Sequence, residues 1–344
     1  MVIQTKITEM FGIKHPVFSA PMGPFYTTDL TIAVSEAGGL GTLSHTNLGG
    51  KSSIDVMKKN METVVEHTDK PFGFNIRTSR MQMDARTLCR KIPDFIRKNQ
   101  KIRNQCLYAV TSAGTAKMLP QSRSFQKLKE ESDIKHFHVA PALWLADKCV
   151  EANVDGLVIT GTEGGGHQSY EKVSTLVLLQ QIEEKYPDVP VIACGGFATG
   201  EGLAAALSLG ADAIAMGTRF IASKDCEFHD DYKGIIPPAS ALDTVLTTGV
   251  FGPIRLWTNR YAKTQDLVGS KEEKKEIEAT LEMDDLEEIN RKYELAYEGN
   301  IEDGAVLVGQ TMGLIDGIRS VSDLMEEIVS DAEKYLKRAN NLIK

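Results

Sequence analysis

The sequence predicts an α/β fold, a (β/α)8 TIM barrel with a C-terminal helical extension. Eight short apolar runs alternate with helical patterns over the first 220 residues, and this repeat is typical of such a barrel. The runs are apolar throughout, as expected for parallel strands covered on both faces. A doubly wound open sheet is the alternative, but its glycine-rich loop would follow the first strand. Here the first strand ends in Ala20-Pro21-Met22-Gly23 and the glycine-rich strand ends come later, so we expect the barrel.

The strands are placed where Val, Ile, Leu and Phe cluster between turn signals. They are expected at residues 17–20, 40–44, 72–76, 106–110, 137–140, 156–160, 189–194 and 213–217. The spacing of apolar residues predicts helices between them, among others at residues 29–37, 54–66, 145–152, 175–185 and 202–209. Gly38 and Gly210 stand just past two of these helices, where a left-handed C-cap is expected.

The pattern changes after the barrel core, which we assign to residues 1–220. Residues 221–303 form an insertion that begins with an irregular stretch, 221–265, because Pro237-Pro238 and the Gly and Pro residues of 249–253 interrupt any periodicity. Residues 270–298 are dense in Glu, Lys and Asp at helical spacing. They fit solvated surface helices or a lid over the barrel mouth. Residues 304–344 return to amphipathic helix and are expected to pack back on the barrel.

Composition narrows the class of function. The formal net charge is −8, with both signs mixed along the chain, which argues against nucleic-acid binding. No apolar run is long enough to span a bilayer, and the N-terminal segment lacks the features of a signal peptide. The five cysteines show no CxxC spacing, which indicates reduced thiols and a cytoplasmic location. We therefore expect an enzyme or binding protein for small molecules.

The carboxyl ends of the strands are where a barrel binds its ligand. Gly195-Gly196 and Gly217-Thr218 follow the seventh and eighth strands, where barrels commonly bind phosphate. Arg219 would either add a charge to this phosphate site or form an ion pair on the barrel rim. No second phosphate site is visible, which favours a mononucleotide such as FMN over a dinucleotide.

Two other strand ends fit the ring system of such a cofactor. Asn75 closes the strand FGFNI, and its amide can both donate and accept hydrogen bonds at the edge of a flavin. Ala20, Pro21 and Met22 would present backbone groups and an apolar face beneath the ring. The alternatives are an amide that caps the next turn and a plain strand-to-loop turn.

His167 follows three glycines in GTEGGGHQS, at the end of the sixth strand. A histidine facing an open pocket, titrating near neutrality, could take a proton from carbon or stabilise negative charge. A structural hydrogen-bonding role is the alternative, and His45, also at a strand end, is the competing candidate for catalysis. His136 and His138 flank a strand and are expected to be structural. No metal-ligand spacing or G-x-S-x-G elbow is present, so we predict neither a catalytic metal nor an acyl-transfer hydrolase.

Several of these segments together resemble the nitronate monooxygenase (2-nitropropane dioxygenase) family of FMN-dependent barrels. TEMFGIKHPVFSAPMG resembles the opening strand and flavin loop of that family, VSEAGGLGTLS its second unit and PFGFNI its third. GTEGGGHQS is similar to the histidine loop, ACGGFATGEGLAAALSLGADAIAMGTRF to the phosphate-binding block and VGQTMGLIDGI to a C-terminal segment that reaches the flavin. The loop departs from the family in having Gly164 instead of alanine and Ser169 instead of glycine.

The resemblance implies an FMN-dependent oxidoreductase with His167 as the catalytic residue. It also implies FMN contacts at Ala20, Pro21, Met22, Asn75, Gly195, Gly196, Gly217, Thr218, Gln310 and Gly313. The substrate side of the flavin would be formed by His45, Glu163, Gly166 and Ser169.

On this basis the favoured reaction is oxidation of an alkyl nitronate with O2. NAD(P)H-driven reduction of a quinone or an enoyl thioester is the alternative, with NAD(P)H as co-substrate. A barrel that binds a phosphorylated metabolite without redox chemistry is the alternative of another class. The sequence does not decide the oligomeric state, and a homodimer is one alternative.

Overall fold

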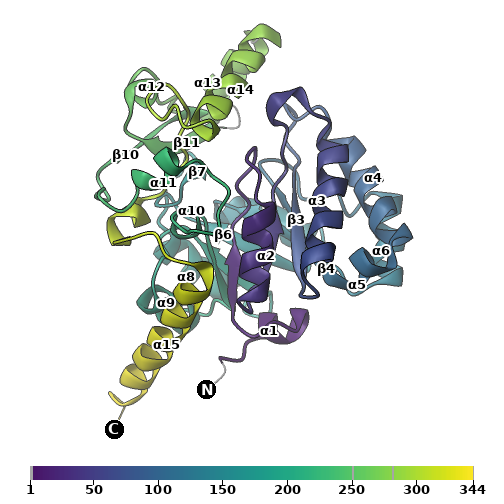
Figure 1. The fold of residues 1–344 in the computed structure, drawn as a ribbon, viewed down its shortest axis with the longest axis vertical. Helices are drawn as coiled ribbons and strands as arrows, with labels where there is room; N and C mark the ends of the chain where they lie inside the picture. Colours follow the sequence, from purple (N-terminus) through teal and green to yellow (C-terminus); the bar gives the residue numbers. More distant parts are fainter. Residues whose placement is uncertain (1–2, 250–251, 281–282, 344) are drawn as a thin grey trace.

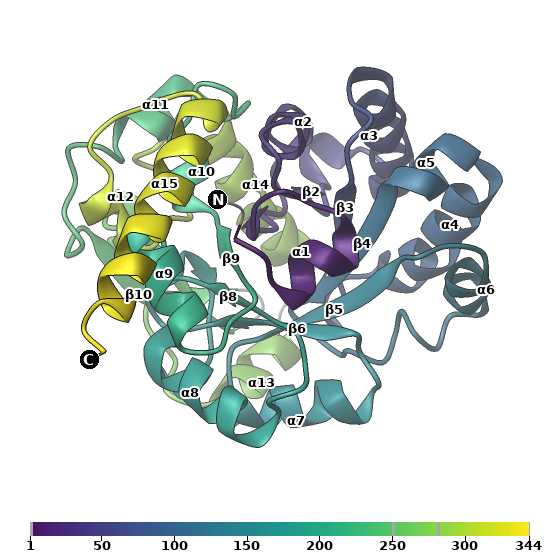
Figure 2. The ribbon, with the colours of Figure 1, turned by 90° about the horizontal axis from the view of Figure 1, so that it is seen from below.

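The computed structural model describes residues 3–249, 252–280 and 283–343, and a barrel of parallel strands forms its centre (Figures 1 and 2). The strands are β1 (Val17–Ser19), β2 (Gly41–Leu43), β3 (Phe72–Arg77), β4 (Cys106–Ser112), β5 (Lys135–Ala140), β6 (Gly156–Thr160), β8 (Val191–Cys194) and β9 (Ala213–Met216). They follow one another in the order β1-β9-β8-β6-β5-β4-β3-β2. A parallel bridge between Phe18 and Leu40 joins the two edges. The predicted (β/α)8 fold is thus confirmed, and each predicted strand overlaps an observed one.

Helices surround the strands in chain order. They are α1 (Lys6–Phe11), α2 (Thr28–Glu36), α3 (Ser53–His67), α4 (Ala85–Lys98), α5 (Gln100–Gln105), α6 (Arg123–Glu131), α7 (Leu143–Glu151), α8 (Thr175–Lys185), α9 (Gly200–Ser208) and α10 (Thr218–Ile221), with a short 3-10 helix η1 (Leu48–Gly50). Side-chain caps help to begin several of them: Ser52, Ser174 and Thr199 accept hydrogen bonds from the first turns of α3, α8 and α9. Such caps satisfy backbone N–H groups that have no partner inside the helix.

The amino-terminal end of the barrel is closed by α1, which crosses it in Figure 2. Phe11 of α1 is buried, and its ring makes edge contacts with Phe18 of β1 and Tyr108 of β4 at centroid distances of 5.9 and 5.6 Å. Phe137 of β5 contacts the same ring. This aromatic group fills the bottom of the barrel, which leaves only the carboxyl ends of the strands open to a ligand.

A small second sheet lies over those carboxyl ends. It contains β7 (Gly166–His167) and the antiparallel hairpin β10 (Thr244–Gly249) and β11 (Gly252–Trp257), in the order β10-β11-β7. The expectation of an irregular stretch at 221–265 is therefore wrong for much of its length. The β-branched and apolar residues of TVLTTG and GPIRLW fit strands. Of the Gly and Pro residues that suggested a break, Gly249 ends β10, Gly252 and Pro253 begin β11, and Pro237-Pro238 precede the hairpin. The stretch also holds α11 (Asp230–Gly234) and α12 (Arg260–Lys263).

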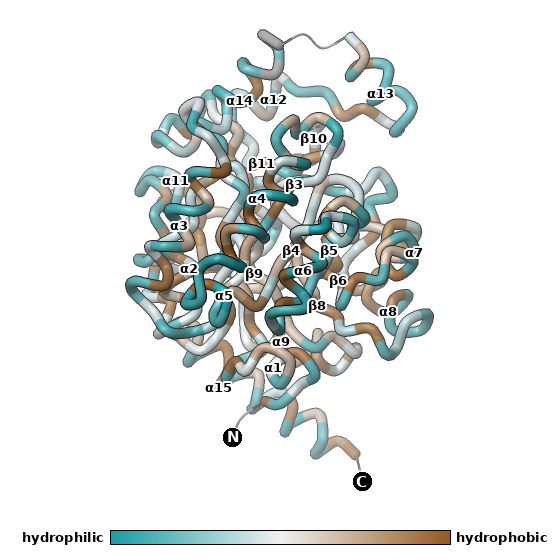
Figure 3. The backbone as a smooth tube through the Cα atoms, turned by 90° about the vertical axis from the view of Figure 1, so that its right-hand side faces the viewer, coloured by the Kyte–Doolittle hydropathy of each residue, from teal (hydrophilic) through white to brown (hydrophobic). Residues whose placement is uncertain are grey.

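The charged stretch forms two helices, α13 (Lys271–Thr280) and α14 (Met283–Tyr297), and Figure 3 shows α13 at the end of the molecule beyond the hairpin. The second helix is anchored by aromatic contacts, since Tyr297 stacks on Phe25 at 5.8 Å and Tyr293 is buried. The chain continues through the 3-10 helix η2 (Gln310–Leu314) to α15 (Val321–Asn340), which packs against α9 and α2. In the part of the chain described here, no helix has both the length and the apolar character that crossing a membrane requires.

Candidate active site

A cavity of about 990 Å³ opens at the carboxyl ends of the barrel strands. Its wall comes from the strand-end loops, from β7, from α13 and from the segment that precedes η2. Most residues that the sequence singled out line it: Ala20, Pro21, Met22, Asn75, Gly166, His167, Ser169, Gly195, Gly196, Gly217 and Thr218. His45, Glu163, Gln310 and Gly313 lie outside it.

Glycines stand at the ends of β8 and β9, and a Cβ atom on Gly196 or Gly217 would meet no protein atom closer than 3.8 Å, whereas one on Gly195 would lie 3.0 Å from Gly164. Gly195 and Gly196 have φ values of +80° and +88°, which glycine adopts without strain. Gly217 differs, because its φ of −100° is open to any residue. A Cβ atom built on Gly217 would meet no protein atom closer than 3.8 Å. Neither the backbone conformation nor protein packing therefore requires a glycine at position 217. A ligand that fills this side of the cavity would require one.

The end of β1, which pairs with β9, and the end of β3 form further parts of the wall. The Met22 backbone N–H donates a hydrogen bond of 2.8 Å to Ser44 Oγ, which fixes the turn after β1. Asn75 is buried, and its Nδ2 donates to the Val110 carbonyl and to Ser112 Oγ, each at 3.1 Å. The Asn75 amide thus ties β3 to β4 while it lines the cavity, and it does not cap a turn.

His167 is held in β7 by the hairpin. Residues 166 and 167 pair with Arg255 and Ile254 of β11, and the Gln168 N–H donates to the Pro253 carbonyl at 2.7 Å. Arg255 Nε also donates to the Thr162 carbonyl at 2.7 Å. The loop after β6 is therefore fixed at several points, which positions the imidazole before any ligand arrives.

The electrostatic setting of His167 differs from the sequence expectation. Burial, together with the positive charges of Arg77 and Lys274, lowers the pKa of His167 to about 3. The imidazole is therefore neutral at physiological pH and does not titrate near neutrality. A neutral imidazole beside two cations is suited to hydrogen-bond an anionic or polarised oxygen.

His45 and Glu163 have structural partners. His45 is fully buried; its Nδ1 accepts from the Arg77 N–H at 3.1 Å, which places the proton on Nε2, 3.3 Å from Asp84. Burial lowers the pKa of His45 to about 4. The Glu163 carboxylate accepts from the Thr175 N–H in the first turn of α8, where a negative charge is favourable.

The C-terminal segment approaches the cavity through neighbours of the predicted residues. Gly309 and Thr311 line it, whereas Gln310 does not. The Gly309 N–H donates to Thr218 Oγ1 at 2.9 Å, and the Gln310 N–H donates to the Glu163 carbonyl at 2.9 Å. Gly313 lies against Ala241, since a Cβ on it would come within 2.6 Å of the Ala241 nitrogen.

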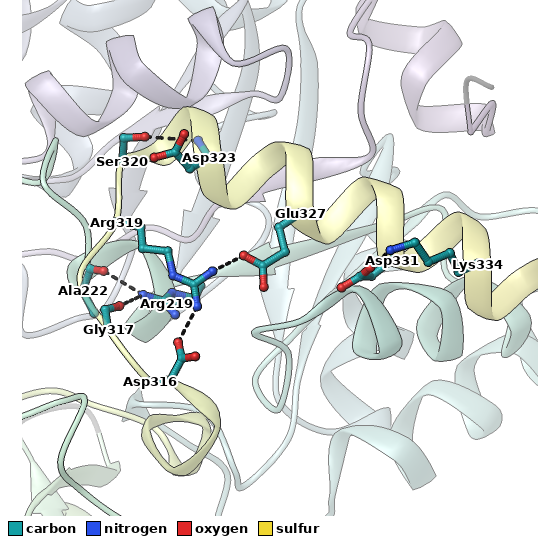
Figure 4. A network of polar contacts seen from close by, with 10 residues as sticks. All are labelled: Arg219, Ala222, Asp316, Gly317, Arg319, Ser320, Asp323, Glu327, Asp331 and Lys334. Atoms are coloured by element: carbon teal, nitrogen blue, oxygen red, sulfur yellow. Dashed lines mark hydrogen bonds and ion pairs between the residues drawn. The ribbon is translucent and has the colours of Figure 1, made fainter.

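Arg219 reaches neither a cavity phosphate nor a rim carboxylate. It is buried, and its Nη2 donates to the carbonyls of Ala222 and Gly317 at 2.8 and 2.6 Å (Figure 4). The neighbouring Arg319 pairs with Asp316 and Glu327. Both sequence interpretations of Arg219 are thus replaced by a structural one, in which its guanidinium joins α10 to the segment before α15.

A ring of cationic side chains around the cavity was not predicted from the sequence. It comprises Arg77, Arg80, Arg86, Lys117, Lys148, Lys271, Lys274 and Lys275, and the carboxylates that line the same cavity are Glu151 and Glu278. Lys274 is only 5% exposed, and its ammonium lies 2.9 Å from Glu278. We call these eight residues the basic ring. Arg77 follows the strand FGFNI directly in sequence, whereas nothing in the sequence marks the lysines of α13.

The other titratable groups in the described part of the chain do not form a second catalytic centre. His136 and His138 are buried, and both contact Thr111 Oγ1, at 2.7 and 2.6 Å, as the structural prediction requires. Burial raises the pKa of the Cys194 thiol in the cavity wall to about 11, so it is protonated. Within the described ranges, no group of three or more His, Cys, Asp or Glu residues could hold a metal ion.

Comparison with known proteins agrees with this arrangement. The family model for nitronate monooxygenase matches residues 4–331. The chain belongs to the nitronate monooxygenase family. The resemblance inferred from the histidine loop and the phosphate-binding block is therefore confirmed.

Individual relatives span almost the whole chain. A protein of Mycobacterium tuberculosis named (3aS,4S,5R,7aS)-5-hydroxy-7a-methyl-1-oxo-octahydro-1H-indene-4-carboxyl-CoA dehydrogenase is 29% identical, with 100% of each chain covered. A probable nitronate monooxygenase of Staphylococcus saprophyticus is 26% identical over 98% of this chain and 100% of its own. The structure of FabK from Thermotoga maritima is 32% identical with a TM-score of 0.80, over 99% and 100% of the two chains. The names of the first two are those of oxidoreductases.

Proposed function

We propose that this protein is an FMN-dependent oxidoreductase. Gly195, Gly196, Gly217 and Thr218 would hold the FMN phosphate, and residues 20–22 and Asn75 would contact the ring. The proposal is supported by the unexplained glycine at 217, whose side-chain position is empty of protein to 3.8 Å, and by the family. When bound, FMN supplies the electron-transfer chemistry, and the protein supplies binding, orientation and electrostatics.

The protein residues have distinct tasks in this proposal. The neutral His167 imidazole donates or accepts a hydrogen bond at the reacting part of the substrate. Arg77 and Lys274 contribute positive charge beside it, which stabilises negative charge that develops on a substrate oxygen. The hairpin β10–β11 keeps water from one side of this group.

The basic ring is the observation that carries our choice of substrate. A small nitronate carries one negative charge, and Arg77 and Lys274 beside His167 suffice to neutralise it. Six further cations line the same 990 Å³ cavity, opposed by two carboxylates. This excess of positive charge fits a substrate that is an acyl thioester on a phosphate-bearing carrier, with NAD(P)H as the co-substrate. The relative named for a carboxyl-CoA substrate supports the same class.

Oxidation of an alkyl nitronate with O2, which the sequence favoured, is the second candidate. It is supported by the family and by the pair of cations beside His167, which would bind the nitronate anion. It leaves the remaining six cations of the basic ring without a ligand.

One experiment separates these candidates. The FMN-loaded protein is mixed anaerobically with NADH or NADPH, then with a 2-enoyl-CoA, and in parallel is assayed aerobically with ethyl nitronate. Bleaching of the flavin by a nicotinamide and its recovery with the thioester is the expected result. Nitronate turnover without bleaching would establish the second candidate instead. As a charge control, Lys117→Glu is expected to raise KM for the thioester at least tenfold and to leave KM for nitronate within twofold.

A further inference from the structure

Trp144 is an exposed aromatic side chain at the cavity mouth. It lies in the first turn of α7 and is 40% exposed. Among the described residues, it is the one exposed large apolar side chain that also lines the cavity. An indole at this place offers an aromatic face on which a planar ligand group can stack.

Two lysines approach this indole from different parts of the chain. Lys148 Nζ, one turn later on α7, lies 4.8 Å from the ring centroid, and Lys271 Nζ at the start of α13 lies 5.0 Å from it. Both line the cavity. Within the part of the chain that the structure describes, neither ammonium pairs with a carboxylate. The two charges are therefore available to an anion.

We infer that Trp144, Lys148 and Lys271 form a subsite for an adenosine phosphate group, in which the adenine stacks on the indole and the lysines bind phosphate. Stacking of a base on an aromatic side chain contributes roughly 5- to 150-fold in affinity. The two exposed cation–π contacts that it would displace contribute roughly two- to fivefold each, or about 5- to 30-fold together, so the exchange on the ring is roughly balanced and the phosphate contacts of the lysines supply the net affinity. A freed ammonium remains close to the ring, where phosphates of the same ligand can accept its hydrogen bonds.

This inference rests on the proposed function and makes its ligand more specific. An adenosine phosphate group occurs in a coenzyme A thioester and in a nicotinamide dinucleotide, and the test distinguishes them. A carrier that presents only phosphopantetheine has no aromatic base and would leave Trp144 unused. Lys117 and Lys275 line the same cavity and add positive charge for further phosphates.

The test uses tryptophan emission, because the chain has only two tryptophans. Trp257 ends β11 and packs against the core, so Trp257→Phe leaves Trp144 as the reporter. The FMN-loaded W257F protein is titrated with adenosine 3′,5′-bisphosphate, with ADP-ribose, with adenosine 2′,5′-bisphosphate and with 4′-phosphopantetheine. We expect saturable quenching by an adenosine phosphate. Preference for the 3′,5′-bisphosphate indicates a coenzyme A thioester, and preference for either of the other nucleotides a dinucleotide.

Calorimetry on otherwise wild-type protein gives the second readout. Trp144→Leu should weaken binding of the preferred nucleotide at least fivefold, and Lys148→Ala with Lys271→Ala should weaken it and reduce its salt dependence. Lys185→Ala is the matched control, since Lys185 lies over Tyr186 at 5.5 Å outside the cavity. Unchanged affinity in Trp144→Leu, or binding of phosphopantetheine alone, would overturn the subsite while FMN binding still stands. A protein that takes up no FMN would overturn the proposed function instead.

Discussion

The substitution Gly217→Ala tests whether a ligand, and not the protein, requires a glycine at the end of β9. The nearest protein atoms to the added methyl group would be Ala20 Cβ and Met22 Sδ, both at 3.8 Å, which is ordinary contact. The φ of −100° suits alanine. The free energy of unfolding of the apoprotein should therefore stay the same or rise by about 0.4–1 kcal/mol, through the reduced entropy of the unfolded chain.

The affinity for FMN should change in the opposite direction. A methyl group forced into an occupied, well-packed site costs about 1–3 kcal/mol, which corresponds to a roughly 5- to 150-fold higher Kd. Urea unfolding of the apoprotein and FMN titration by fluorescence quenching measure the two quantities separately. Gly234→Ala is the control, because Gly234 is exposed at the end of α11 and no atom lies within 4 Å of an added Cβ. If Gly217→Ala binds FMN within twofold of wild type, the reasoning about this glycine is refuted.

Three further predictions concern the histidines and Glu163. His167→Ala should bind FMN within twofold of wild type and lose roughly 100-fold or more in kcat; nearly full activity would remove His167 from the proposed mechanism. Glu163→Gln should lower the free energy of unfolding by about 0.3–1 kcal/mol, because a negative charge at the start of α8 is lost. We expect kcat/KM to change less than threefold; a hundredfold fall in kcat/KM would instead place Glu163 among the catalytic groups. Burial lowers the pKa of His136 and of His138, the latter from 6.5 to about 4, so below pH 6.5 the unfolded chain binds protons that the folded chain does not. The stability contributed by each histidine is therefore complete above about pH 6.5 and decreases as the pH falls below it. For His138 the loss extends to about pH 4 and amounts to about 3 kcal/mol; equal urea midpoints at pH 7 and pH 4.5 would contradict this.

The barrel could be predicted from the sequence because its signal is local. Each strand is a short apolar run, and the position of a residue at a strand end places it at the ligand side whatever the neighbours are. The same rule predicted that His167 and Gly217 lie at one site, and both line the cavity. It failed for His45, because a position near a strand end does not say which way the side chain points, and this ring faces Asp84.

The second sheet and the basic ring could not be predicted, for different reasons. The two-residue strand β7 pairs with β11, about 90 residues later in the chain, and a strand of that length has no periodicity to detect. The lysines of α13 lie in a helix that is charged on nearly every face. Only the packing of that helix over the cavity decides that Lys274 is buried and that Lys271 reaches Trp144.

The flavin content of the purified protein shows directly whether the strand-end glycines and Asn75 form an FMN site. We predict a yellow protein that releases about one FMN per chain on denaturation, and an apoprotein that regains the flavin spectrum when FMN is added back. A colourless protein that neither releases FMN nor binds it when supplied would contradict the account and would favour a barrel without redox chemistry.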